Sequence, residues 1–264
     1  MLIDRAIDSH IAKRLALAAM LSLFRCPEPV LPAVLHIGVR TVPLVVVRQP
    51  RARRLLLRAD AIGGVIRLTL PPRASLRDAE AFLAQHDRWL AQRIAAWPCP
   101  LPLAPDARLP FDGGWLTLDW QPSRSRGVVR DGDRLLLGGM VATVAGRTQR
   151  WLRAAALSEL ELATYALAAR IERPLQTVTV RDPAARWGSC GARPPRIAYS
   201  WRLILAPGWV RHSVVAHEVA HLVHANHGSA FWRLAAELND GDPAPARAWL
   251  KAHGPALHWI GREG

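Results

Sequence analysis

Residues 214–232 read VVAHEVAHLVHANHGSAFW, and this stretch holds four of the ten histidines of the 264-residue chain. Apolar residues surround the first of these histidines, which predicts a largely buried helix from about residue 208 to about residue 225. On such a helix His217 and His221 are four positions apart and therefore lie on the same face. Two imidazoles on one face of a buried helix indicate a metal site.

Glu218 completes the pattern H-E-x-x-H, here HEVAH. In this pattern two imidazoles hold a zinc ion, and the glutamate takes a proton from the water bound to the metal. The pattern also arises by chance in chains of this composition, so its surroundings must support it. A catalytic zinc site needs a third protein ligand and leaves its fourth position to water.

His227 is the first candidate for the third ligand. It follows Asn226, which tolerates the left-handed conformation that ends many helices, and it precedes Gly228 and Ser229, a good cap for a new helix. A chain reversal at this point would carry His227 back to the face of the two helical histidines.

Three other residues compete for the same role. His224 shares the helix face, but at ~1.5 Å per residue it lies roughly 10 Å along the axis from His217. Glu237 lies sixteen residues past His221 in a segment with apolar neighbours. Cys190, from an upstream loop, would bind zinc well as a thiolate.

Four segments together resemble the YgjP-like metallopeptidases, a bacterial group similar to the SprT-like zinc proteases. They are RWGSC (186–190), WRLILAP (201–207), HEVAHL (217–222) and NHGSAFW (226–232). The resemblance extends more loosely to LTLPPRAS (68–75) and the strands before it. It implies a zincin-like catalytic half, one zinc ion (Zn2+) held by His217, His221 and His227, and Glu218 as the catalytic base.

Other residues near these segments carry weaker hypotheses. Ser189 and Cys190 could border the cleft, and Tyr199 is a candidate oxyanion donor because few other polar groups lie near the motif. His224 is expected outside the ligand set or at the surface. The segment 196–206 leads directly into the predicted helix, so a strand near the metal could offer a free edge to an extended peptide.

The rest of the chain predicts an α+β protein. Short branched-aliphatic runs before residue 72 indicate a small antiparallel sheet, and three further strands are expected over residues 114–139. A helix with a capping box at Ser75 and Asp78 should run until Pro98, and a second helix should cover residues 148–171. Strands return at 175–181 and 196–206, and no internal repeat is visible in the sequence.

These elements predict three regions. Residues 1–33 form an N-terminal extension, residues 34–147 a β-rich N-terminal lobe with one helix, and residues 148–264 the metallopeptidase domain with its HExxH helix. The five prolines from Pro98 to Pro110 are too many for regular structure and favour an internal boundary there.

The net charge of +14 comes almost wholly from arginine. Five arginines fall within one short segment and could bind phosphates: Arg48, Arg51, Arg53, Arg54 and Arg58. A solvated strand face in a generally basic protein is the favoured interpretation of the run. Nucleic acid is therefore the alternative partner to a protein or peptide substrate.

The location of the protein is predicted from cysteines and apolar runs. Cys26, Cys99 and Cys190 are an odd number at wide spacings, which favours a reducing compartment. The apolar run 15–24 is too short to cross a bilayer and lacks the flanks of a signal peptide. We therefore expect a cytoplasmic protein that does not enter membranes.

The sequence thus predicts a zinc-dependent metallopeptidase. The alternative is a nucleic-acid-associated protein, including a DNA-linked protease of the SprT kind, in which the arginine-rich surface carries the binding.

Overall fold

A computed structural model describes residues 31–263. These residues form two compact units, residues 31–60 with 64–96 and residues 61–63 with 97–263. The border after Ala96 lies beside the proline-rich segment that favours a boundary. The N-terminal extension is outside the described residues except for 31–33, and so is the apolar run 15–24. The division at residue 147 stays a prediction.

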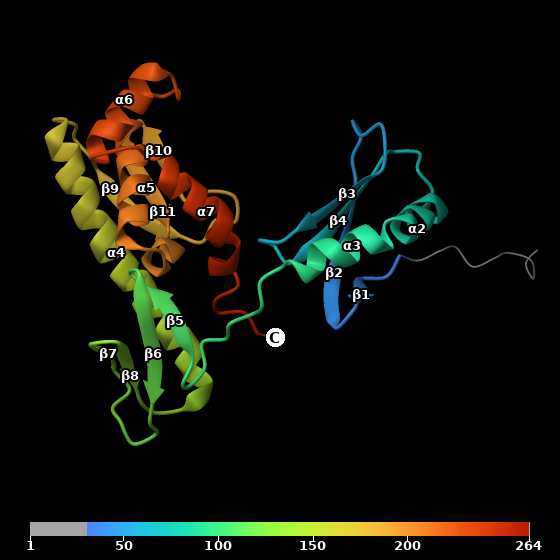
Figure 1. Ribbon diagram of the computed structural model, residues 1–264, viewed down its shortest axis with the longest axis horizontal. Helices are drawn as coiled ribbons and strands as arrows, with labels where there is room; N and C mark the ends of the chain where they lie inside the picture. Colours follow the sequence, from blue (N-terminus) through green and yellow to red (C-terminus); the bar gives the residue numbers. More distant parts are fainter. Residues whose placement is uncertain (1–30, 264) are drawn as a thin grey trace, which may run out of the picture. The chain divides into compact units, whose positions relative to one another are not determined.

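The first unit is a four-stranded sheet with two helices on one face (Figure 1). Its elements are β1 (Val34–Ile37), β2 (Arg40–Arg48), β3 (Leu56–Asp60), β4 (Val65–Leu70), α2 (Leu76–Gln85) and α3 (Asp87–Ala95). The strand order is β1-β2-β4-β3. The predicted antiparallel sheet is wrong in one respect, because the central strands β2 and β4 are parallel.

The helices of this unit begin as the sequence predicts and then depart from it. Ser75 and Asp78 form the capping box, with both reciprocal hydrogen bonds present. The single predicted helix is divided at His86, whose Nδ1 donates to the carbonyl of Phe82 at 2.8 Å. His86 is both the C-cap of α2 and the N-cap of α3, so one helix ends and the next begins at this residue.

The second unit begins with a sheet of the same topology. Its strands are β5 (Arg108–Phe111), β6 (Gly114–Trp120), β7 (Val128–Asp131) and β8 (Arg134–Leu137), in the order β5-β6-β8-β7. Both sheets pair antiparallel, parallel and antiparallel across their four strands. The structure therefore contains a repeat that the sequence does not reveal.

The repeat extends to individual hydrogen bonds. Gln49 follows β2 and donates its backbone N–H to the carbonyl of Leu70 at 2.9 Å. Gln121 follows β6 and donates in the same way to Leu137, also at 2.9 Å. The two sheets thus end their central parallel pair with the same bond.

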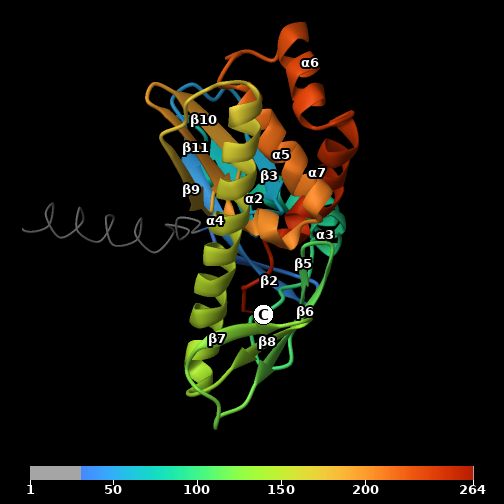
Figure 2. The same ribbon diagram turned by 90° about the vertical axis from the view of Figure 1, so that its left-hand side faces the viewer.

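The remaining elements form the C-terminal part of the second unit. They are a short 3-10 turn η1 (Val141–Thr143), α4 (Val144–Arg170), β9 (Thr177–Arg181), β10 (Gly188–Ala192), β11 (Pro195–Ser200), a 3-10 helix η2 (Trp201–Leu205), α5 (Gly208–Ala220), α6 (Ser229–Leu238) and α7 (Ala244–Leu257). The three strands form a sheet in the order β10-β11-β9. Figure 2 shows α4 running from this sheet to the sheet β5–β8.

One apolar core joins these elements. The buried positions of α4 recur mainly at intervals of four, which is one face of a helix. They are Val144, Thr148, Leu152, Ala156, Leu160, Thr164, Leu167 and Ala168. This face packs with buried residues of both sheets and of α5, α6 and α7 in one cluster. Among the described residues, no helix is long and apolar enough to cross a membrane.

Two expectations for the C-terminal part of the second unit are wrong. Residues 201–205 form a 3-10 helix and not the end of a strand. Ser200 starts this turn by accepting a hydrogen bond from the Arg202 N–H at 3.3 Å. The strand β10 has the sequence GSCGA, whose two glycines give no β-strand signal, and the sequence does not predict it.

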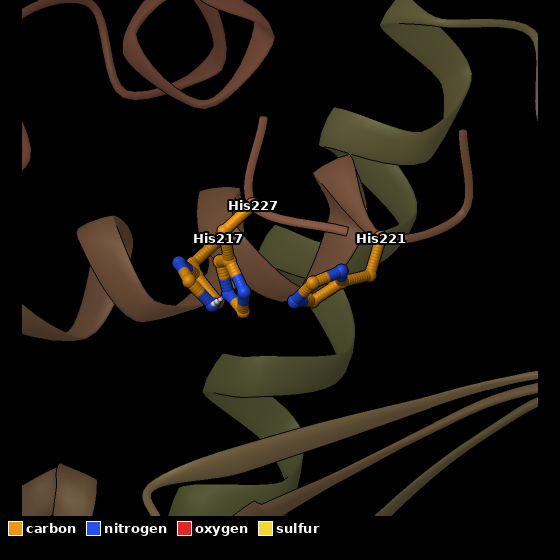
Figure 3. A group of neighbouring side chains, drawn as sticks. All are labelled: His217, His221 and His227. Atoms are coloured by element: carbon orange, nitrogen blue, oxygen red, sulfur yellow. Dashed lines mark hydrogen bonds between the residues drawn. The ribbon is translucent and has the colours of Figure 1, made fainter. Parts of the chain in front are cut away.

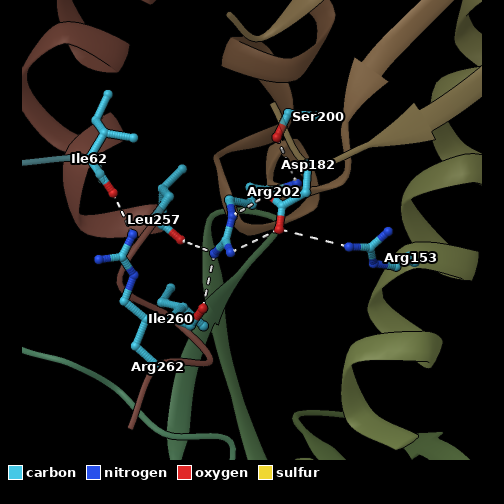
Figure 4. A network of polar contacts seen from close by, with 8 residues as sticks. All are labelled: Ile62, Arg153, Asp182, Ser200, Arg202, Leu257, Ile260 and Arg262. Carbon is cyan, nitrogen blue, oxygen red and sulfur yellow. Dashed lines mark hydrogen bonds and ion pairs between the residues drawn. The ribbon is translucent and has the colours of Figure 1, made fainter. Parts of the chain in front are cut away.

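Arg202 joins three segments in the C-terminal part of the second unit (Figure 4). Its Nε donates to Asp182 Oδ1 at 2.8 Å, and one terminal nitrogen donates to the carbonyls of Leu257 at 2.6 Å and Ile260 at 2.9 Å. Burial raises the pKa of Asp182, but the hydrogen bonds from Arg202 and the charge of Arg153 leave it below its ordinary value. Arg202 thus ties η2 to the end of α7.

Replacing Arg202 by Ala is expected to lower the free energy of unfolding by about 3–5 kcal/mol, because it leaves a half-buried carboxylate and two carbonyls without their donor. Arg153→Ala is the matched control, since Arg153 meets the same carboxylate at 3.7 Å with 39% of its side chain exposed. That variant should lose less than about 1 kcal/mol. Urea denaturation of both proteins measures the difference, and equal losses would contradict this role of Arg202.

Candidate functional site

The helix α5 presents His217 and Glu218 from the interior of the second unit. Its apolar residues are buried as predicted except Trp209 near its start, and Glu218 is 5% exposed. The helix is shorter than predicted, because it ends at Ala220 and His221 is its C-cap. The chain leaves through a tight turn, in which the N–H of Val223 bonds to the carbonyl of Ala220 at 3.1 Å.

The chain then reverses into α6, as predicted, but by different means. Among the described residues, Asn226 is not one of those with positive φ. Gly228, and not Ser229, is the N-cap of α6, with extended backbone and no side-chain cap bond. The reversal returns His227 toward α5.

Three imidazoles converge at this reversal (Figure 3). The ligand atoms of His217, His221 and His227 all lie within 4.8 Å of one another. The Nε2 atoms of His217 and His227 are 3.1 Å apart. Two nitrogens bound to one tetrahedral zinc ion at 2.0–2.1 Å would be separated by roughly 3.3 Å.

The protonation of these rings also suits a metal ion. Burial, followed by the neighbouring His221 and His227, lowers the pKa of His217 to about 4, so this ring is neutral at pH 7 and has a free lone pair. The Nδ1 of His221 donates to the carbonyl of His224 at 3.0 Å, which leaves its Nε2 as the acceptor. Such a bond fixes the tautomer and orientation of a metal-binding histidine. The three side chains therefore fit a zinc ion.

The competing candidates lie outside this group. Within residues 31–263, His217, His221 and His227 form the one group of three or more His, Cys, Asp or Glu residues close enough to hold a metal. His224 takes part through its backbone carbonyl, as described above. Glu237 is exposed on α6, and Cys190 lies on β10.

Glu218 follows His217 on α5, is buried, and lines the same pocket as that imidazole. Burial raises the pKa of its carboxyl to about 7, and the charge of Arg186 opposes that increase. A carboxylate with a pKa near the working pH both takes and returns a proton efficiently. A buried glutamate without an ion-pair partner among the described residues is costly to a fold, which favours a functional reason for its presence.

A family model described as "YgjP-like, metallopeptidase domain" matches residues 53–253, which is well over half of the chain. The chain belongs to the YgjP-like family. This confirms the resemblance predicted from the four sequence segments, and it makes the protein a metallopeptidase. No curated protein and no solved structure matches the chain.

Aromatic residues that sequence reasoning passed over enclose the histidines of this YgjP-like chain. The ring centre of Phe231 lies 4.5–4.9 Å from those of all three imidazoles, and its side chain is fully buried. The ring centre of Trp232 lies 5.8 and 5.6 Å from those of His217 and His227. Both aromatic residues are the last two of the NHGSAFW segment, so the sequence of this segment could have predicted aromatic contacts to the histidines.

In the RWGSC segment of this YgjP-like chain, the glycine leaves space for the side chain of Glu218. A Cβ atom at Gly188 would lie 2.4 Å from Oε1 of Glu218 and 2.6 Å from its Cγ and Cδ. Real Cβ atoms do not approach so closely, so only glycine leaves room for this carboxylate. Sequence reasoning considered Ser189 and Cys190 instead and missed Gly188.

The neighbouring residues have other surroundings. Ser189 pairs with Ala198, and Cys190 pairs with the buried Ile197, so successive residues of β10 face opposite sides of the sheet. Cys190 therefore lies on the helix side, where burial and then the charge of Glu218 raise its pKa to about 11. A thiol with this pKa stays protonated at pH 7.

Tyr199 does not suit an oxyanion donor. Its side chain is fully buried, and its hydroxyl lies 3.0 Å from the hydroxyl of Thr164 on α4. The physical reason is its place on β11, on the face that packs against the helices. Its hydroxyl is thus used within the core.

Replacing Gly188 by Ala is expected to reduce activity about a hundredfold, because the added methyl group displaces the Glu218 carboxylate by about an ångström. Bound metal should be unchanged, since the atoms nearest to the added Cβ belong to Glu218 and not to a histidine. Gly191→Ala, on the same strand, is the control, because its Cβ would meet nothing closer than 3.8 Å. Kinetics and metal content of both variants test this; equal activities would show that Gly188 does not position Glu218.

Proposed function

We propose that this metallopeptidase is a zinc enzyme of the zincin type, in which His217, His221 and His227 hold the ion and Glu218 is the general base. The observation that carries the proposal is the convergence of three imidazoles beside a buried glutamate. Zinc supplies two things when bound: it lowers the pKa of water, and it polarises a carbonyl.

The residues of the chain would act as follows. Glu218 takes a proton from the attacking water and returns it to the leaving amine, which its raised pKa permits. His221 is held in one tautomer by the His224 carbonyl. Phe231 excludes water from behind the three rings, which strengthens the electrostatic interactions in the site.

The strand β10 is the proposed binding edge for substrate. Among the described residues it pairs with β11 alone, so its other edge is free, and its first residue touches Glu218. An extended peptide could add to this edge through main-chain hydrogen bonds, which tolerate many side chains. A free edge is the feature expected of one of the sheet's strands near the metal, and β10 is an edge strand of that sheet.

A peptide-library digest tests the proposed function. The purified protein should hold about one zinc ion and cleave peptides, a chelator should stop cleavage, and added zinc should restore it. Metal analysis that finds no zinc in an active protein would refute the choice of metal.

A second candidate function, nucleic-acid binding, rests on unpaired arginines. Arg51, Arg53, Arg54 and Arg58 are exposed, and none of them forms an ion pair among the described residues. Arg48 differs, because its guanidinium donates to three carbonyls, those of Pro71, Pro72 and Ala74, at 2.8–2.9 Å.

Salt dependence distinguishes this candidate from binding of a neutral peptide. If the four free arginines contact phosphates, the logarithm of DNA affinity should fall with the logarithm of salt concentration with a slope of about −3 to −4. Replacing the four by Gln should remove that slope, and Arg48→Gln should not be used because it disturbs the fold. Equal rates of peptide cleavage with and without DNA would show that DNA does not regulate the enzymatic activity.

A further inference from the structure

A pocket of about 240 Å³ adjoins the candidate site within the second unit. Its apolar walls come from β10, α5, α7 and the segments beside them. These residues are Trp187, Val214, Pro243, Ala246 and Leu250. The space is below the ~300 Å³ at which small-molecule pockets usually begin, so it suits one side chain and not a whole ligand.

The pocket is next to the proposed reacting groups. His217 and Glu218 form part of its lining. Ser213, one helical turn before His217, also lines it and adds a hydroxyl to the wall. A side chain in this pocket therefore belongs to a residue adjoining the bond that is cleaved.

Two guanidinium groups also line the pocket from separate elements. Arg186 precedes β10, and Arg247 lies on α7. Both are exposed, and neither forms an ion pair with a carboxylate in residues 31–263. The guanidinium of Arg247 lies 4.5 Å over the ring of Trp232, which holds it beside the histidines. Neither cation is therefore neutralised by a direct ion pair, although the charge of Arg186 acts on the Glu218 carboxyl in the same pocket lining.

The chemistry of arginine specifies the missing partner. A guanidinium has a planar fork of donors that fits a carboxylate with two parallel hydrogen bonds. In a peptide, a carboxylate comes either from the chain terminus or from an Asp or Glu side chain. The pocket itself offers a mainly apolar surface, so it suits an apolar side chain.

We infer that this pocket binds the apolar side chain of a residue adjoining the scissile bond, and that Arg186 and Arg247 bind a carboxylate close to it in the same substrate. The protein then selects peptides that combine an apolar residue with a nearby acidic group. This inference rests on the proposed function in treating the ligand as a substrate, whereas the pocket alone specifies the chemistry of the ligand.

Binding to the zinc-loaded Glu218→Gln protein tests the ligand chemistry without hydrolysis. Labelled peptides with one leucine differ only in one acidic group: Glu against Gln beside the leucine, and a free against an amidated C-terminus. One of these changes should weaken binding by about tenfold to a hundredfold, as loss of a charged hydrogen-bonding pair does. The Glu–Gln pair reports a side-chain carboxylate, and the terminal pair reports a chain end.

Charge reversal provides the decisive variant. Arg186→Glu with Arg247→Glu should reverse the preference: Lys in place of Glu binds more tightly if the ligand is a side-chain carboxylate, and the amidated peptide binds more tightly than the free one if it is the chain end. A protein that failed to fold could not gain either preference. Arg233→Glu is the matched control, because Arg233 is exposed on α6 and does not line the pocket. It should keep the preference of the unaltered protein.

Cleavage by the unaltered protein separates failure of the inference from failure of the proposed function. Cleavage beside apolar residues with a nearby acidic group supports the inference, and cleavage that ignores the acidic group overturns it. If nothing is cleaved, the proposed function fails, and the binding series still decides the inference: equal affinities for acidic and amide peptides overturn it, and the predicted weakening supports it.

Discussion

Glu218→Gln is expected to abolish peptide hydrolysis while the protein keeps its zinc. Glutamine has the shape of glutamate but takes no proton from water, and loss of a general base typically costs 10²–10⁴-fold in rate. The pocket around residue 218 should hold the amide, since burial already favours the neutral form of the carboxyl. Initial rates on a cleaved peptide and metal analysis of the same samples measure both effects.

The control for this variant is Glu237→Gln. Glu237 is exposed on α6 and lies outside the group of converging histidines. Its replacement should change neither the rate nor the zinc content. Full activity in Glu218→Gln would refute the mechanism, and loss of zinc in that variant would show that the carboxylate is a ligand.

His227→Ala is expected to lose zinc and activity together. His227 supplies one of three converging nitrogens, and two histidines on one helix rarely retain a catalytic zinc ion alone. We expect zinc content to fall from about one ion per chain to a small fraction of that after dialysis. Cys190→Ala and Glu237→Ala should keep stoichiometric zinc.

The Cys190→Ala variant tests the strongest alternative to His227 as the third metal ligand. The raised pKa of Cys190 disfavours its thiolate, but a bound cation lowers the pKa of a coordinating thiol. If the Cys190→Ala protein contained no metal, the third ligand would therefore be Cys190 of β10 and not His227. Retained zinc in Cys190→Ala together with its loss in His227→Ala would confirm the histidine.

The sequence predicts the site better than the architecture around it. Spacing along one helix predicts that His217 and His221 share a face, because four positions are about one turn. The turn at Gly228 predicts that His227 returns, although the residues that make the turn differ from those expected. Local geometry decides both results, so no knowledge of distant contacts is needed.

Distant contacts account for the features that the sequence does not reveal. Gly188 approaches Glu218 from thirty positions away, and a glycine at such a place serves a tight turn or a bulge as readily as a close approach. The parallel pair of β2 with β4 depends on how the segments between them return across the sheet. The repeat of the two sheets is carried by strand order and shared backbone bonds, and some matching positions, such as Gln49 with Gln121 and Leu70 with Leu137, hold the same residue whereas others differ.

The three metal ligands are close together in the sequence, so the chain can bind metal without being correctly folded for catalysis. The three histidines fall within residues 217–227, so the chain can bring them together before its distant parts meet. If the unfolded chain also binds zinc, the ion stabilises the folded state less than it would in a protein whose ligands come from distant parts of the sequence. The base depends in contrast on the long-range meeting of α5 with β10. A preparation can thus carry its full complement of zinc and still be misfolded where the proton is transferred, so turnover and not metal content measures the fraction of correctly folded molecules.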